Sequence, residues 1–346
     1  MNVCPLVYLA GIILLLGCNS EPVNKKEILP AFYHWKTEFA PAGVEWNTIR
    51  QNNVKDIYLR FFDVSWDETY NKPSPIAQLR VRNKAIFFKE KIGVIPTVFI
   101  TNECIRYIQP DQCKSLAKNI YKLITDIAAV NNLDAIKEIQ IDCDWTASTK
   151  DKYFSLLTEL QLIDTMHLYS ATIRLFQVKY AAEAGVPPVK KGLLMCYNMG
   201  NIKSLATNNS ILDPAEVKKY TSNLDKYPLP LDVALPAFGW YVLFRNNGYA
   251  GLIQNMNEDS LRSYSKQIAK NRFQITNDVE LNNVVFKKGD VLRYEGSSYA
   301  DIMATASILK QKIKSDSFRL SLYHLDSITL SKYSAHEIKS IFRSLH

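Results

Sequence analysis

The fold prediction and the candidate site both rest on one stretch of the sequence, Glu138-Ile139-Gln140-Ile141-Asp142-Cys143-Asp144-Trp145-Thr146. Side chains alternate between the two faces of a β-strand. The odd-numbered positions from Ile139 to Trp145 are apolar and suit packing beneath helices, whereas Gln140, Asp142 and Asp144 share the opposite face. In a closed parallel barrel that face is the interior, and the strand ends at the mouth where barrel enzymes keep their active sites. The pattern therefore predicts two inward carboxylates, with Asp144 nearer the opening.

Two other interpretations of this alternation stay open. The strand could lie at the surface with both acids in water. The acids could also form a structural ion pair, since Arg60 and Arg174 lie within other strand patterns and either could neutralise Asp142. If both carboxylates do face a barrel interior, burial and mutual repulsion raise at least one pKa. Such perturbed acids are typical of functional sites.

The rest of the chain alternates short apolar runs with segments of helical periodicity. Together with the quoted stretch, the expected strands are Ile28–Trp35, Val54–Phe62, Ile92–Ile100, Ile136–Trp145, His167–Leu175, Gly192–Asn198, Leu231–Trp240 and Phe318–Leu325. Between them the periodicity predicts helices over Lys114–Val130 and Lys152–Ile163. An N-cap with proline at Asp213-Pro214 and a capping-box spacing at Ser334 and Glu337 predict two further helix starts.

Strands separated by crossover helices predict a (β/α)₈ barrel of the TIM type. An open doubly wound sheet is the alternative, but no glycine-rich phosphate loop follows the first strand, which counts against a nucleotide-binding fold. The stretch Phe273–Tyr294 breaks the pattern, because it alternates in polarity and contains turn signals. It predicts a β-hairpin inserted near 273–294 in a single barrel domain over 28–346.

The N-terminus is expected to be a targeting signal that directs the chain to a membrane. Residues 6–17 form an uncharged apolar run of 12 residues, shorter than the roughly 20 that a spanning helix needs. The run ends Leu15-Leu16-Gly17-Cys18, which resembles the lipobox of bacterial lipoproteins. The resemblance implies a signal peptide over 1–17, acylation of Cys18 by lipid such as palmitate, and a tether over 18–27. A bacterial cell-envelope protein anchored to a membrane is expected, in a leaflet that the sequence does not fix.

Composition and charge limit the classes of binding partner that are expected. The chain has 346 residues, a formal net charge of +8, 22% charged and 47% hydrophobic residues, which is too apolar for a disordered chain. Its basic residues are scattered rather than gathered in a stripe with aromatics, so no nucleic-acid partner is expected. A weak attraction to anionic membranes or polyanionic glycans fits the charge.

The cysteines and acids suggest no metal site. Cys104 and Cys113 could form a disulfide in an oxidising compartment, whereas Cys143 and Cys196 fit buried core positions. No cysteine–histidine cluster has zinc-ligand spacing. A pair of aspartates alone does not supply the six or so oxygens that Ca²⁺ requires, so neither a metal nor a cofactor is expected.

Three motifs, in order along the chain, resemble those of chitinase-like family 18 glycoside hydrolases. Asp142-x-Asp144 resembles the family's Asp-x-Asp-x-Glu strand, and Met195-Cys196-Tyr197-Asn198 its Met-x-Tyr-Asp/Asn on the sixth strand. Leu235-Pro236-Ala237-Phe238-Gly239 resembles its Leu-Pro-x-Tyr-Gly on the seventh. The match spans the expected barrel from Ile28 to Leu325, and the chain is similar to bacterial lipoproteins related to that family.

The resemblance implies roles for particular residues. Asp144 would orient the substrate N-acetyl group, Asp142 would support it, and Tyr197 and Asn198 would bind the acetamido group. The family's general acid, however, falls at Thr146, and threonine cannot protonate a leaving oxygen at neutral pH. The candidate substitutes at strand ends are Asp63, Glu103, Asp326 and Asp144 itself.

Aromatic residues near the expected strand ends suit a sugar groove, although core or rim packing is the commoner use of any one ring. Trp240 and Trp66 are the preferred stacking candidates, and Arg60 is a further candidate ligand contact. Two functions follow. The protein is a glycoside hydrolase acting on a β-linked, N-acetylated glycan, or, because of Thr146, a lipoprotein that binds glycan without cleaving it. A structural envelope protein is a third alternative.

Overall fold

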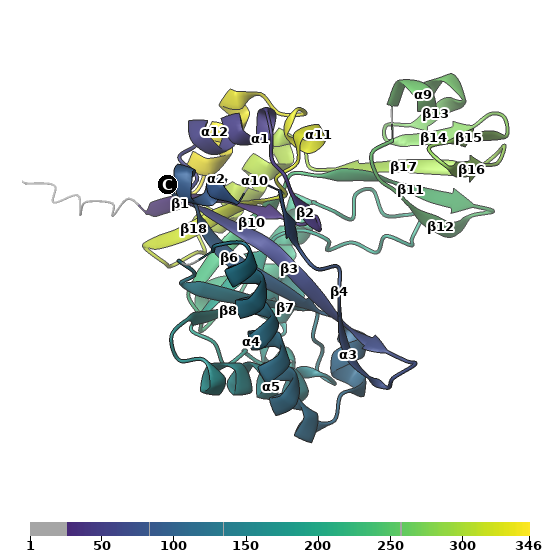
Figure 1. The fold of residues 1–346 in the computed structure, drawn as a ribbon. Helices are drawn as coiled ribbons and strands as arrows, with labels where there is room; N and C mark the ends of the chain where they lie inside the picture. Colours follow the sequence, from purple (N-terminus) through teal and green to yellow (C-terminus); the bar gives the residue numbers. More distant parts are fainter. Residues whose placement is uncertain (1–25, 83, 134, 257) are drawn as a thin grey trace, which may run out of the picture.

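A computed structural model describes residues 26–346 except 83, 134 and 257, and its main body is a closed barrel of parallel strands (Figure 1). In spatial order the barrel strands are β1 (Glu27–His34), β18 (Ser317–Tyr323), β10 (Leu231–Pro236), β9 (Lys191–Met195), β8 (Leu168–Arg174), β7 (Glu138–Cys143), β6 (Gly93–Ile100) and β3 (Asp56–Asp67). Because β1 pairs with both β18 and β3, the sheet has no free edge at this point. The predicted (β/α)₈ barrel is confirmed, and the open sheet is not formed.

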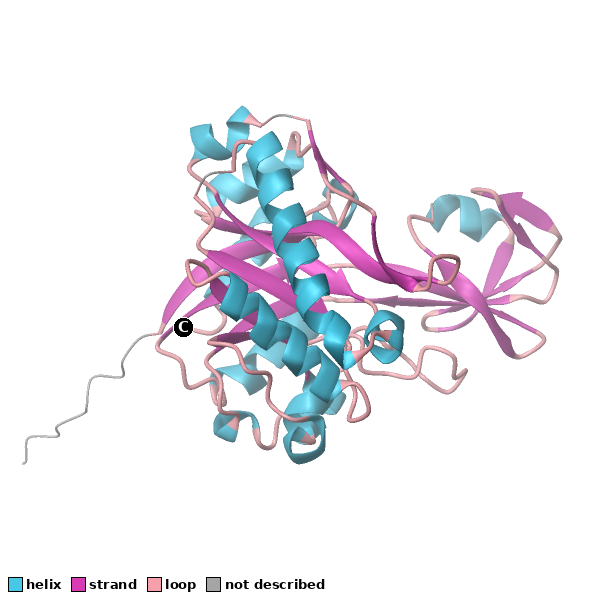
Figure 2. Cartoon of the chain, turned by 60° about the horizontal axis from the view of Figure 1, so that its bottom comes forward, coloured by secondary structure: helices cyan, strands magenta, loops and turns pink. Residues whose placement is uncertain are grey.

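Helices cover the outside of this barrel (Figure 2). They are α1 (Val44–Gln51), α2 (Ala85–Glu90), α3 (Asn102–Tyr107), α4 (Cys113–Val130), α5 (Lys150–Ile163), α6 (Leu175–Lys179), α7 (Ala181–Ala184), α8 (Pro214–Tyr220), α10 (Tyr299–Lys310), α11 (Ser327–Leu330) and α12 (Ala335–Arg343), with 3₁₀ turns at Pro110–Gln112 and Leu224–Lys226. Both predicted caps form: Asp213 Oδ1 accepts from the Ala215 N–H at 2.8 Å, and Ser334 and Glu337 make a reciprocal capping box.

The alternation along β7 has the predicted direction. Trp145 is fully buried outside the barrel, where its Nε1 donates to the Ala184 carbonyl at 2.9 Å, and Tyr153 of α5 donates to the Ile141 carbonyl at 3.1 Å. On the opposite face Gln140 accepts a hydrogen bond from Tyr33 of β1, across the barrel interior. Every residue of β7 is buried, so the surface-strand interpretation is wrong.

A network of charged residues closes the barrel at the end where the strands begin. Arg319 of β18 lies 2.7 Å from Asp56 of β3, 2.6 Å from Glu138 of β7 and 3.3 Å from Asp232 of β10. Lys191 of β9 lies 2.7 Å from the same Asp232. Five strands thus meet through ion pairs, so this end is filled by side chains and the opposite end is the open one.

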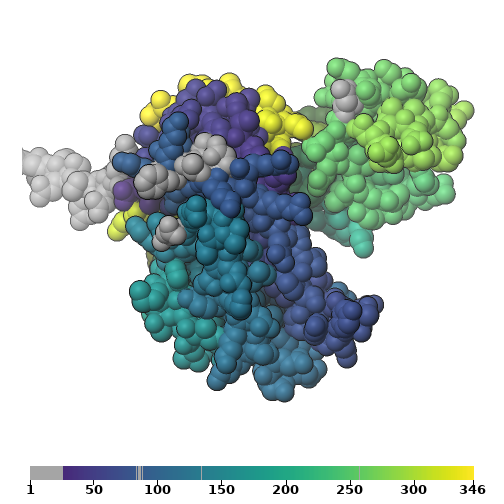
Figure 3. Space-filling view, viewed as in Figure 1, coloured from purple at the N-terminus to yellow at the C-terminus, as the bar shows by residue number. Residues whose placement is uncertain are grey.

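The insertion between β10 and α10 is larger than the hairpin expected near 273–294. It comprises β11 (Gly239–Arg245), β12 (Gly248–Ile253), α9 (Glu258–Ser263), β13 (Ser265–Ala269), β14 (Arg272–Ile275), β15 (Val279–Leu281), β16 (Val284–Phe286) and β17 (Val291–Gly296). We call residues 239–296 the insertion subdomain, which Figure 3 shows in green as a lobe beside the barrel. It has its own apolar cluster, including Leu261, Ile275, Phe286 and Leu292.

Smaller elements complete the fold. β3 continues beyond the barrel and pairs antiparallel with β4 (Lys72–Ile76), and the short strands β2 (Glu38–Phe39) and β5 (Arg80–Val81) pair with each other. The expected signal peptide (1–17), Cys18 and all but the end of the tether (18–27) lie outside the described residues. In the described part of the chain no helix is long and apolar enough to cross a membrane, and Cys104 and Cys113 are separate buried thiols.

Candidate functional site

The two aspartates of β7 lie at different depths in the open end of the barrel. Asp142 is only 3% exposed, and its Oδ1 accepts from the Thr172 hydroxyl of β8 at 2.5 Å. The Asp144 side chain is 46% exposed, and its Oδ1 accepts from the Arg174 Nε at 2.5 Å. The inward direction of both acids and the exposure of the outer one agree with the prediction for this strand.

The burial of Asp142 has the largest effect on its pKa. Burial raises the pKa of Asp142 to about 6, the positive charge of Arg174 opposes this rise, and the negative charge of Asp144 adds to it. A carboxyl with that pKa is partly protonated just below neutral pH, which an exposed aspartate is not. The site therefore holds the arginine-bound carboxyl group of Asp144 above the buried carboxyl group of Asp142, which changes its protonation state near pH 6.

The arginine pairing differs from the one considered for Asp142. Arg174 bonds to Asp144 instead, and Arg60 pairs with Asp63 through its Nε, 2.7 Å from Oδ1. The register of β3 shifts between Arg60 and Phe62, a bulge that brings Arg60 and Asp63 onto the same inner side of the strand. Because of this bulge, Arg60 pairs with Asp63 of its own strand and not with Asp142. Its guanidinium carbon also lies 5.5 Å from the centre of the Trp35 ring.

A row of aromatic rings leads away from the acids along the mouth. Tyr197, just after β9, lies 5.3 Å from Tyr323 and 5.9 Å from Phe238 between ring centres, and Phe238 lies 5.3 Å from Trp240. Burial raises the pKa of Tyr197 far above its usual range, and among the described residues its hydroxyl has no hydrogen-bond partner. We call Tyr197, Phe238, Trp240 and Tyr323 the aromatic row.

Asn198 and the loop after it form one side of the mouth. Asn198 has a left-handed backbone with φ of 57°, which asparagine tolerates better than most residues, and its exposed side chain is at the rim. Its N–H donates to the Ile211 carbonyl at 2.9 Å, which ties the two ends of the loop over 199–210 together. Tyr197 is close enough to Asp142 and Arg174 for their charges to act on its hydroxyl, and Asn198 follows it at the rim.

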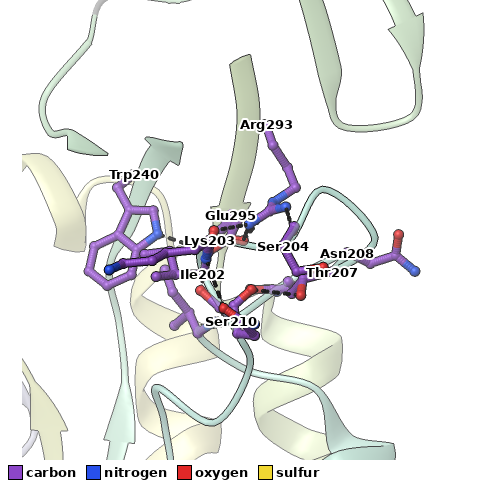
Figure 4. A network of polar contacts seen from close by, with 12 residues as sticks. Ile202, Lys203, Ser204, Thr207, Asn208, Ser210, Trp240, Arg293 and Glu295 are labelled. Atoms are coloured by element: carbon purple, nitrogen blue, oxygen red, sulfur yellow. Dashed lines mark hydrogen bonds and ion pairs between the residues drawn. The ribbon is translucent and has the colours of Figure 1, made fainter. Parts of the chain in front are cut away.

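Trp240 is held from behind by a buried glutamate. Its Nε1 donates to Glu295 Oε2 at 2.9 Å, and the same oxygen accepts from the Ser210 hydroxyl of the 199–210 loop (Figure 4). Glu295 is 1% exposed and lies on β17 of the insertion subdomain. The half-buried indole is thus fixed by a contact from a strand far along the chain.

Arg293 neutralises that glutamate. Its Nε lies 2.7 Å from Glu295 Oε1, and its other nitrogens donate to the carbonyls of Ser204 at 2.6 Å and Ile202 at 2.9 Å (Figure 4). Neither Arg293 nor Glu295 is among the candidates predicted from the sequence. The available signal was the pattern Arg293-Tyr294-Glu295, which places opposite charges on one face of a strand.

The structure separates Trp66 from the other candidates. Trp66 lies on the part of β3 that extends beyond the barrel, opposite Pro73 of β4, and its ring centre is 5.7 Å from that of Tyr107. Among the described residues its ring contacts are with this neighbour and not with the aromatic row. Its assignment as a stacking residue stays a prediction.

At the position of the missing general acid, the hydroxyl of exposed Thr146 lies 2.9 Å from that of Ser148. Asp63 is bound to Arg60, and Glu103 is exposed on α3. Burial acts to raise the pKa of Asp326, but hydrogen bonds from Lys36 and the Thr329 N–H hold that pKa below its usual range. A group with a lowered pKa is a poor proton donor.

The sequence matches no family model and no curated protein. Solved structures do resemble the chain. The C-terminal domain of a putative chitinase from Desulfitobacterium hafniense is 12% identical with a TM-score of 0.56, over 93% of this chain and 100% of that one. A chitinase from Bacteroides thetaiotaomicron is 12% identical with a TM-score of 0.55, over 91% and 96%.

The spore cortex-lytic enzyme SleL of Bacillus cereus is 13% identical with a TM-score of 0.53, over 93% of this chain and 75% of that one. At such identities the similarity concerns the fold. The chain therefore has the fold of the chitinase-like glycoside hydrolases, as the three sequence motifs indicated.

Proposed function

We propose that the protein holds a β-linked, N-acetylated glycan at the open end of its barrel. The observation that carries this proposal is the half-exposed Asp144, whose partner Arg174 also lies near Tyr197, the start of a row of aromatic rings that ends at Trp240. Ring faces suit the apolar faces of pyranoses, and the carboxylate and the Asn198 amide suit their polar substituents. The chitinase-like fold supports the same ligand class.

The site favours binding over cleavage for two reasons. Thr146 stands where a proton donor is needed, and the Arg174 guanidinium already occupies Oδ1 of Asp144. Loss of a general acid costs about 10²–10⁴-fold in rate. In this proposal Asp144 and Tyr197 orient the acetamido group, and Arg174 fixes the carboxylate.

Glycoside hydrolysis is the second candidate function, and the pKa of Asp142 favours it. That pKa of about 6 leaves a proton on the buried acid under mildly acidic conditions. If the Asp142–Asp144 pair supplies the proton that Thr146 cannot, cleavage increases as the pH falls towards 6. Release of reducing ends from chitin-type and peptidoglycan-type oligosaccharides across pH 4.5–8 measures this, and Asp142→Asn should abolish it.

The binding proposal is tested by isothermal titration calorimetry with chitohexaose and peptidoglycan-type oligosaccharides. Trp240→Ala should weaken binding about tenfold or more through lost ring contact, and Asp144→Asn less, because the amide keeps its shape. Tyr180→Ala is the matched control, since Tyr180 is an exposed aromatic between α6 and α7. Absence of saturable binding to both glycan types would contradict the proposal.

We also propose that the mature chain is a lipoprotein of the bacterial cell envelope, anchored through Cys18. The support is the sequence Leu15-Leu16-Gly17-Cys18 after an apolar run. Stable anchoring needs more than one acyl chain. Mass spectrometry of the mature N-terminus should find an acylated Cys18, and Cys18→Ala should release the protein from the membrane fraction. An unmodified, soluble wild-type protein would contradict the anchoring.

A further inference from the structure

A cavity lies between the insertion subdomain and the barrel. It has a volume of about 620 Å³ and is lined by the start of β11, the region of α9, the β13–β14 turn and α11. β11 follows β10, and α11 follows β18, both at the end of the barrel where Asp144 opens to solvent. We call this cavity the side cleft.

Aromatic rings form one wall of the side cleft. The Tyr241 ring lies 5.1 Å from the Tyr294 ring and 6.3 Å from the Phe273 ring, and all three residues line the cleft. Tyr294 and Glu295 are neighbours on β17 and so point to opposite faces of the sheet. The rings therefore belong to the face opposite the buried Arg293–Glu295 pair, and Trp240, which that pair supports, also lines the cleft.

The charges at the side cleft are mainly positive. Arg262 is paired with Glu258 at 2.7 Å, so these two lining residues neutralise each other. Lys332 of the barrel side lies 3.4 Å from the Tyr294 hydroxyl and 5.6 Å from the centre of its ring. Lys270 is exposed, and no acid in the described part of the chain pairs with it. Two lysines thus remain available to an anionic group, one on each side of the cleft.

The rings and lysines together define a ligand chemistry. Aromatic rings suit the flat faces of a sugar, the lining amides of Asn255 and Gln267 suit its hydroxyls, and ammonium groups suit a carboxylate. We propose that the side cleft binds a sugar unit that carries a carboxylate, so that the protein prefers acidic β-linked glycans to neutral ones. This inference rests on the proposed function, because it names the class of glycan that the protein takes.

The test compares two oligosaccharides of similar length by isothermal titration calorimetry on the full chain. Hyaluronan hexasaccharide supplies β-linked N-acetylated units that alternate with carboxylated sugars, and chitohexaose is the neutral probe. The informative variant is Lys270→Ala/Lys332→Ala. The matched control is Lys266→Ala/Lys288→Ala, which removes two exposed lysines of the same subdomain that do not line the cleft.

The expected result is tighter binding of hyaluronan than of chitohexaose by the wild type. The cleft variant should lose about tenfold in affinity for hyaluronan, because each ammonium–carboxylate contact is a charge-assisted hydrogen bond, and should bind chitohexaose as before. The control variant should bind both probes like the wild type. A higher salt concentration should lower the affinity for hyaluronan but not for chitohexaose, since salt screens exposed charges.

Other results would overturn the inference. Saturable binding with equal affinity for both probes, unchanged in the cleft variant, would leave the proposed function standing and remove the acidic-sugar site. No binding of either probe would overturn both. If the cleft variant lost binding only to vesicles of phosphatidylglycerol and phosphatidylcholine, the cleft would be a membrane contact and the glycan inference would be wrong.

Discussion

At the scale of single residues, the depth of each acid sets its chemistry. Asp142 and Asp144 are two positions apart on one strand, yet one is buried under Thr172 and the other is half exposed beside Arg174. Alternation along the strand predicted their common direction. It could not predict their arginine partners, because those depend on which strands are neighbours and on the bulge in β3.

Arg174 should hold the pKa of Asp142 down. Arg174→Gln removes the positive charge that opposes the effect of burial, so the pKa of Asp142 should rise from about 6 by about one unit or more. Carboxyl ¹³C titration by NMR measures this. Lys179→Gln, on α6, is the control and should leave the titration of Asp142 unchanged. A fall in the pKa of Asp142 in Arg174→Gln would contradict the assignment.

Glu295 should position Trp240 and also stabilise the fold. Glu295→Gln leaves Arg293 buried without its counter-charge, which should cost about 3–5 kcal/mol in the free energy of unfolding. Urea denaturation measures the loss. Glu280→Gln is the control, because Glu280 is exposed on β15 and its replacement should change the free energy of unfolding by less than about 0.5 kcal/mol.

A double variant separates the two roles of Glu295. Arg293→Met/Glu295→Leu replaces the buried ion pair by apolar groups and should recover most of the lost stability. It still removes the acceptor of the Trp240 indole N–H, so affinity for chitohexaose should stay reduced. Recovery of both stability and affinity would contradict a positioning role for Glu295.

At the scale of elements, local signals predicted those parts that depend on nearby residues. All eight barrel strands overlap their predicted ranges, and the caps at Asp213 and Ser334 form as expected. The sequence predicts too small an insertion, because the run Leu231–Trp240 has the pattern of one strand. The chain in fact leaves β10 at Pro236 and enters β11 at Gly239, which starts a separate five-stranded sheet.

The capping box of α12 should contribute measurably to stability. The Ser334 hydroxyl accepts from the Glu337 N–H at 3.2 Å, so Ser334→Ala should cost about 1 kcal/mol in the free energy of unfolding. Ser307→Ala is the control, because Ser307 is exposed within α10, where alanine is the better helix former. Urea denaturation of both variants measures the difference, and an equal effect would contradict a capping role.

At the scale of the whole molecule, folding buries histidines that must stay neutral. Burial, with the charges of His324 and Lys36 adding to it, lowers the pKa of His34 to about 3, and burial lowers that of His324 to about 4. Both pKa values are below the unfolded value of about 6.5, so the unfolded chain binds protons first as the pH falls. Stability is therefore full above about pH 6.5 and declines below it.

The size of this pH effect follows from linkage. At pH 5 the protonation of each histidine in the unfolded chain should lower the free energy of unfolding by about 2 kcal/mol, while Asp142, whose folded pKa is raised, should increase it by about 1 kcal/mol. The free energy of unfolding should thus fall by about 2–3 kcal/mol between pH 7 and pH 5, as measured by urea denaturation. His336→Gln, at an exposed position on α12, should leave this dependence unchanged. Constant stability over that range would contradict buried neutral histidines.

The sequence alone determined the barrel, the direction of Asp142 and Asp144, and the helix starts, because alternation, periodicity and capping act over a few neighbouring residues. The folded chain was needed to see that Arg174 binds Asp144, that Glu295 fixes Trp240 and that a cleft lined by two lysines without an acid partner in the described part of the chain opens beside α11. These features join segments that are far apart along the chain. Their contacts depend on strand order, register and the docking of the insertion subdomain, which no local pattern encodes.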